Sequence, residues 1–122
     1  MNDKGSALII ARPSQLRASL QVLLTTIPQI EQVDLVDSGP AALVLSVEYL
    51  PSLVLLDLNL SDYQTASTLK QLKVKWPHSQ YIVLVDTAPG KQLATSAKAA
   101  VILIKGAPAA KLLAAIEKLL SQ

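Results

Sequence analysis

The 122-residue sequence contains no cysteine, only four glycines and a single histidine. Without cysteine the chain can form neither a disulfide nor a thiolate metal site. The glycines do not form G-x-G-x-x-G or G-x-x-x-x-G-K-[ST], which excludes a glycine-rich loop for nucleotide phosphates. The histidine, His78, follows a proline and has no cysteine, glutamate or second histidine near it in sequence, so we do not expect a metal ligand or a general base there.

Long apolar runs are also missing. None approaches the roughly 20 residues that span a bilayer, because Asp, Lys or Pro interrupts each one. No leader-like segment precedes the first apolar run, and together with the absence of cysteine this favours a reducing, cytoplasmic location. We therefore expect a soluble protein that does not insert into membranes.

Charge of either sign is scarce. The net charge is +2, and the 11 basic residues are scattered apart from Lys70, Lys73 and Lys75. These lysines stand at helical spacing beside two leucines, so we expect them to form the solvated face of an amphipathic helix, and a phosphate-binding stripe is the alternative. Direct nucleic-acid binding by this chain is not expected.

Apolar residues make up 51% of the chain, which suits one globular domain over residues 1–122. Short apolar runs alternate with longer amphipathic segments, a pattern typical of βαβ units. The sequence predicts an α/β fold with a doubly wound, five-stranded parallel sheet and helices on both faces. The predicted strands are Ala7–Ala11, Gln32–Val36, Leu53–Asp57, Gln80–Val85 and Val101–Ile104.

Helices are predicted between and after these strands. Ser14 is placed to cap the first, Pro51 to end the second and Pro108 to begin the last. The first carries an apolar stripe at helical spacing, formed by Leu16, Leu20, Leu23, Leu24 and Ile27. The others cover Ala41–Tyr49, Asp62–Lys75, Gly90–Ala99 and the segment after Pro108.

The last helix carries a wide apolar stripe. The stripe either packs entirely against the sheet or lies partly in a homodimer interface. Its members are Leu112, Leu113, Ile116, Leu119 and Leu120.

Asp57 is the candidate functional residue, because it ends the apolar run of the third strand. Open α/β sheets bind ligands at the carboxyl ends of their strands. The neighbouring Leu58 and Asn59 supply no second carboxylate of the kind that aspartate-nucleophile phosphatases use. We therefore expect a signalling site and not an enzyme.

The chain resembles the receiver domains of two-component response regulators, most closely those that precede helix-turn-helix output domains. The resemblance rests on Leu55-Leu56-Asp57-Leu58-Asn59-Leu60, on Trp76-Pro77 and on Lys105. It implies a flavodoxin-like sheet of order 2-1-3-4-5, with Asp57 as phosphoacceptor and Lys105 in the phosphate pocket.

Two acidic residues at the end of the first strand hold Mg²⁺ in that family, together with the phosphoacceptor. Here the two positions are Ala11 and Arg12. Asp57 and the backbone carbonyl of Asn59 alone would hold the ion weakly, so we expect no metal or other cofactor, or Mg²⁺ only weakly bound.

The residues that report phosphorylation also depart from the family pattern. Val85 stands where the family has a hydroxyl residue, although Thr87 takes over that role if the strand is slipped or bulged. Ile102 stands at the aromatic switch position.

Arg12 raises a further hypothesis. Its guanidinium either pairs with Asp57 in place of the metal or projects into solvent. With Lys105 also near, a paired Asp57 would stay ionised, and the domain would hold one conformation.

The sequence therefore predicts an atypical receiver that acts through contacts with signalling proteins, such as a histidine kinase or an output domain. The alternative is a working receiver that accepts a phosphoryl group on Asp57 and controls a DNA-binding output domain. A small enzyme or flavin carrier on the same fold is a third hypothesis, without support from any motif.

Overall fold

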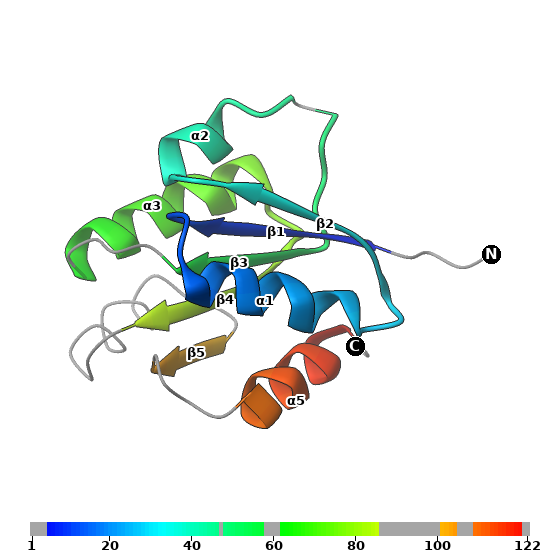
Figure 1. Cartoon of the computed structure of the whole chain (residues 1–122). Helices are drawn as coiled ribbons and strands as arrows, with labels where there is room; N and C mark the ends of the chain where they lie inside the picture. The colour runs from blue at the N-terminus through cyan, green and yellow to red at the C-terminus, as the bar shows by residue number, and fades with distance from the viewer. Residues whose placement is uncertain (1–4, 47, 58–61, 86–100, 105–108, 121–122) are drawn as a thin grey trace.

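The protein folds around one parallel sheet in which the strands follow the order β2-β1-β3-β4-β5 (Figure 1). The structure, a computed structural model, describes residues 5–46, 48–57, 62–85, 101–104 and 109–120. The strands are β1 (Gly5–Ala11), β2 (Ile30–Val36), β3 (Leu53–Asp57), β4 (Gln80–Val85) and β5 (Val101–Ile104). The predicted fold class and strand order are confirmed, and only β1 and β2 begin earlier than the sequence indicated.

Helices cover both faces of the sheet, as Figure 1 shows. One core lies between the sheet and the helices α1 (Gln15–Thr25) and α5 (Ala109–Leu120). The second lies between the sheet and the helices α2 (Gly39–Leu43) and α3 (Asp62–Lys75). Because both faces of the central strands are buried, those strands are continuous apolar runs.

Helix α1 begins where the sequence predicted. The Ser14 side chain accepts a hydrogen bond from the Arg17 backbone N–H at 3.0 Å, which satisfies one of the donors that a helix leaves open at its first turn. Leu20 and Leu24 are buried as expected. Leu16 was placed on the same stripe but is 39% exposed, because it lies in the first turn, at the carboxyl edge of the sheet.

Helix α2 is much shorter than predicted. It ends at Leu43, whereas the sequence pattern extended it to Tyr49. The backbone carbonyls of the following segment accept hydrogen bonds from the end of α3 instead of from a continuing helix. Lys75 Nζ donates to the Leu45 carbonyl at 2.8 Å, and Trp76 Nε1 donates to the Tyr49 carbonyl at 2.9 Å.

Helix α3 has the predicted bounds, and Leu69 and Leu72 face the sheet. The prediction of a fully solvated lysine face was wrong for two of its lysines. The ammonium group of Lys73 lies 5.9 Å from the ring centre of Tyr81, and that of Lys75 lies 5.5 Å from the ring of Trp76. Both stems are half-buried, while Lys70 is exposed as expected.

The apolar stripe of α5 packs against the sheet. Three of its members are buried, and Leu113 and Leu120 pack against the same core. This arrangement agrees with the burial alternative, and the homodimer stays a prediction. The predicted fourth helix, Gly90–Ala99, and Pro108 lie outside the described residues. None of the helices in the described part of the chain has the length and apolar character needed to cross a bilayer.

Candidate functional site

Asp57 is the last residue of β3 and is 6% exposed. It lies beside Ala11, the last residue of β1, in the parallel register. The strands all point to the same edge of the sheet in Figure 1, and Asp57 lies at this carboxyl edge. The structure therefore places it where open α/β sheets bind their ligands.

Ala11 and Arg12 differ in their surroundings. Ala11 is 1% exposed, so a buried methyl group occupies the end of β1 next to Asp57. Arg12 is exposed, and among the described residues it makes no ion pair with Asp57. Of the two alternatives for Arg12, the structure agrees with the one in which the side chain projects into solvent.

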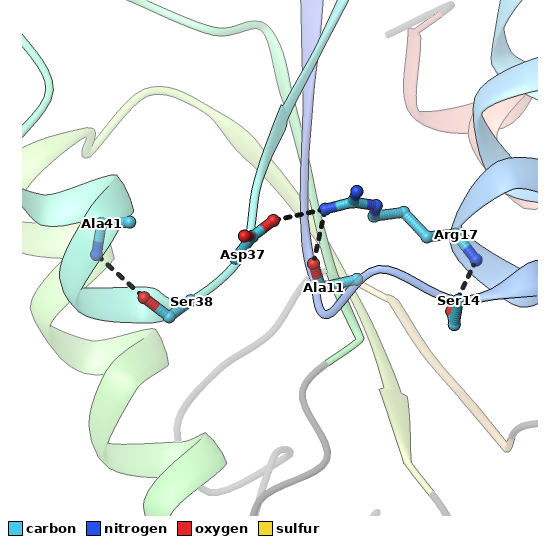
Figure 2. A network of polar contacts seen from close by, with 6 residues as sticks. All are labelled: Ala11, Ser14, Arg17, Asp37, Ser38 and Ala41. Atoms are coloured by element: carbon cyan, nitrogen blue, oxygen red, sulfur yellow. Dashed lines mark hydrogen bonds and ion pairs between the residues drawn. The ribbon is translucent and has the colours of Figure 1, made fainter.

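A different arginine reaches the end of β1. Arg17, in the first turn of α1, extends its guanidinium back across the carboxyl edge (Figure 2). Its Nη1 donates to the Ala11 carbonyl at 3.1 Å and to Asp37 Oδ1 at 2.6 Å. We call this arrangement, Arg17 with Ala11 O and Asp37, the arginine clasp.

The clasp joins the first two βα connections of the fold. Asp37 directly follows β2 and precedes Ser38, whose side chain caps α2 by accepting from the Ala41 N–H at 3.2 Å. Ser14 caps α1 in the same way, and both capped helices begin at this edge (Figure 2). The Arg17 side chain is 17% exposed and Asp37 is 70% exposed, so the guanidinium is the more buried partner of the ion pair.

The sequence reasoning missed Arg17 and Asp37. One local signal was present, since a cation in the first turn of a helix is unfavourably placed in the helix dipole unless an acceptor compensates it. The first turn of α1 has no acidic residue. The compensating carboxylate comes from the end of another strand, which periodicity does not indicate.

Strand order places two aspartates on either side of Ala11. In each of β2, β1 and β3, the residues two and four positions before Asp37, Ala11 and Asp57 pack in the core under α1 and α5. Alternate residues of a strand share a face, so Ala11 and Asp57 lie on that face, while Asp37 directly follows the end of β2. With β1 between β2 and β3, Asp37 therefore lies on one side of Ala11 and Asp57 on the other.

Magnesium does not fit the donors found at the end of β1. The ion requires several oxygen ligands in near-octahedral geometry. Here the position of a family acid is a methyl group, and the adjacent carbonyl already accepts from a guanidinium. No group of three or more acidic or histidine side chains in the described ranges is arranged to hold a metal ion.

The remaining site residues are placed in part. Val85 ends β4 and pairs with Ile104, while Ile102 lies on β5 opposite Val83. Val85 and Ile102 therefore both lie on strands, β4 and β5, where the resemblance placed them. Three further residues of the predicted pocket, Asn59, Thr87 and Lys105, lie outside the described residues.

The sheet order, the two helical layers and the buried aspartate at the end of β3 define the receiver fold of response regulators. No family model matches the sequence, and no curated protein matches it either. Solved structures do match over nearly the full length, and they include receiver domains and response regulators.

Three of them illustrate the similarity. The signal receiver domain of a histidine kinase from Syntrophus aciditrophicus has a TM-score of 0.81 and 18% identity, covering 96% of this chain and 90% of that one. A LuxR family DNA-binding response regulator from Silicibacter pomeroyi has a TM-score of 0.80 and 22% identity, covering 96% of this chain and 92% of that one. The receiver domain of a sensor histidine kinase from Pseudomonas aeruginosa has a TM-score of 0.79 and 15% identity, covering 97% of this chain and 98% of that one.

The Pseudomonas structure has a magnesium ion coordinated in its active-site cleft. At these identities the similarity establishes the fold.

Proposed function

We propose that the chain is an atypical receiver domain of two-component signal transduction, which acts through protein contacts without ordinary Mg²⁺-dependent phosphorylation. The observation that carries the proposal is the arginine clasp beside Asp57. Receiver phosphorylation places negative charge on an aspartate, and a cation bound by neighbouring oxygens offsets that charge. In this chain the carbonyl of Ala11, beside Asp57, accepts from Arg17.

The clasp also favours a domain with one conformation. Arg17 holds the ends of β1 and β2 together through two hydrogen bonds, one of them charge-assisted on both sides. A ligand shifts a conformational equilibrium only when it interacts differently with the two states. An edge that already contains its own cation has little to gain from binding another. The proposed partners are therefore signalling proteins, such as a histidine kinase or an output domain, and we propose no enzymatic activity.

Phosphorylation of the purified domain tests the proposal. The chain is incubated with acetyl phosphate and Mg²⁺, and separately with beryllofluoride and Mg²⁺, beside Asp57→Asn as the matched control. We expect no phosphoryl adduct in the intact mass and no NMR shift changes specific to Asp57, because Mg²⁺ lacks its ligands at the end of β1.

The opposite result would identify the alternative function. An adduct that forms on the wild type and disappears in Asp57→Asn would show a working receiver. Asp57 has the placement that this reaction needs, at the carboxyl end of a buried strand. In that case control of a DNA-binding output domain becomes the better hypothesis.

A further inference from the structure

We infer that Arg17 is a built-in replacement for a divalent cation at the carboxyl edge and that it keeps such ions out. The inference rests on the proposed function and assigns its physical cause to one residue. The residue is not Arg12, which follows β1 directly in the sequence, but an arginine six positions after Ala11.

The atoms that Arg17 binds are the first step of the argument. Its Nη1 contacts a carboxylate oxygen of Asp37 at 2.6 Å and a main-chain carbonyl oxygen at 3.1 Å. Carboxylates and backbone carbonyls are the protein ligands that hard divalent cations take. The guanidinium nitrogen thus occupies a position between two oxygens of the kind that would otherwise bind an ion.

The charges around the clasp are the second step. Asp37, directly after β2, and Asp57, at the end of β3, flank Ala11 at the end of β1. Adjacent parallel strands lie about 4.8 Å apart, so the strand ends that carry these two carboxylates, two spacings apart, are separated by about 10 Å, which is about one Debye length at 0.1 M salt. Ala11 contributes no charge between them, and Arg17 contributes a positive charge that is bound to Asp37.

Burial is the third step. The Arg17 side chain is largely shielded from solvent, whereas Arg12 is exposed. Its partner Asp37 is 70% exposed, so the shielding from solvent is on the arginine side of the ion pair. The two arginines therefore provide a matched comparison: they carry the same charge and lie near the same edge, but only Arg17 occupies the clasp.

Removing Arg17 should expose a cation site. In Arg17→Gln the Asp37 carboxylate and the Ala11 carbonyl lose their cationic donor, and Asp57 remains one strand away from Ala11 and two from Asp37. We expect Mn²⁺, used as the probe, to bind Arg17→Gln at least about tenfold more tightly than the wild type, which corresponds to about 1.4 kcal/mol. Binding is measured by isothermal titration, and paramagnetic broadening of amide signals around Ala11, Asp37 and Asp57 gives the location.

Arg12→Gln is the control for charge alone. If it gains as much Mn²⁺ affinity as Arg17→Gln, the gain comes from net charge and the inference is wrong. A second variant, Arg17→Gln with Asp37→Asn, should lose the gained affinity, because Asp37 is the carboxylate that the clasp releases. Circular dichroism and a cooperative unfolding transition establish that each variant is folded.

The outcomes separate this inference from the proposed function. Tight Mn²⁺ binding and phosphorylation of the wild type would overturn the proposed function. A wild type without either property, together with an Arg17→Gln variant that gains no affinity, would overturn only the role of Arg17.

Discussion

Tyr81 closes the end of α3 with its side chain. Its hydroxyl shares its proton between the carbonyls of Leu72 at 3.0 Å and Trp76 at 2.7 Å. These carbonyls also accept from the backbone N–H groups of Trp76 and Ser79, so the hydroxyl adds a second donor at the end of the helix. The residue is 1% exposed. Burial raises the pKa of Tyr81 from 10.0 to about 12.

This raised pKa predicts a loss of stability at alkaline pH. Tyr81 ionises at about 10 in the unfolded chain and at about 12 in the folded one. The contribution of the Tyr81 hydroxyl to the free energy of unfolding is therefore complete below about pH 10. It declines as the pH rises toward 12, by at most about 1.4 kcal/mol per pH unit.

Urea unfolding of wild type and Tyr81→Phe at pH 7 and pH 11 measures the effect. At pH 7 we expect the wild type to be more stable by about 1 kcal/mol, because the variant loses the hydroxyl donor. At pH 11 this advantage should shrink or reverse. Both proteins should still lose some stability, since burial and a hydrogen bond to Asp34 also raise the pKa of Tyr49. An equal advantage at both values of pH would contradict the assignment to Tyr81.

Single residues also show how far the site was predictable. Asp57 was found because a carboxylate that ends an apolar strand is a local feature, and the structure places it at the expected edge. For a cationic partner at that edge the sequence suggested Arg12, the arginine that follows the first strand directly, with projection into solvent as the alternative. The structure places Arg17 there instead, because a helical first turn directs its side chain back over the end of β1. Sequence distance was a poor guide to spatial distance at this point.

At the scale of elements, the segment between α2 and β3 depends on the end of α3. Lys75 and Trp76 donate to carbonyls at positions 45 and 49. The rings of Tyr49 and Trp76 also meet edge to face, with their centres 6.0 Å apart. The segment is thus held by side chains from another element, which replaces the hydrogen bonds of the predicted longer helix.

Replacing Lys75 with methionine tests this dependence. The variant keeps an apolar stem but loses the hydrogen bond to the Leu45 carbonyl and the ammonium group over the Trp76 ring. We expect a loss of about 1–2 kcal/mol in the free energy of unfolding. The Leu45 amide, which donates to the Ala42 carbonyl, should exchange faster with solvent.

Lys70→Met provides the control on the same helix. Lys70 is exposed, so its replacement should change stability by less than about 0.5 kcal/mol. Equal effects of the two substitutions would mean that the Lys75 contacts do not hold the segment.

The elements were predictable to different degrees for a physical reason. β3 to β5 and α3 have the predicted bounds, because turn residues and prolines limit them locally. The predicted end of α2 was wrong. The segment that follows α2 is held by a residue 30 positions away, through the hydrogen bond from Lys75 to the Leu45 carbonyl. Contacts of that kind decide where a helix stops without leaving a pattern in the helix itself.

At the scale of the whole molecule, one sheet separates two cores. Ile116 lies fully buried in the core under α1 and α5, while Trp76 lies 2% exposed in the core under α2 and α3. The central strands contribute side chains to both cores. A sheet shared in this way should make the two halves unfold together, as one domain.

Ile116→Ala tests that cooperativity from a distance. Deleting most of a buried isoleucine side chain should cost about 2–5 kcal/mol. Trp76 is the only tryptophan in the chain, so its fluorescence reports on the opposite core. We expect urea unfolding followed by Trp76 fluorescence and by far-UV circular dichroism to shift by the same amount in the variant, with an unchanged dependence on urea concentration. A fluorescence midpoint that stays in place while the circular dichroism transition moves would show two independent units and would contradict the prediction of a single domain over residues 1–122.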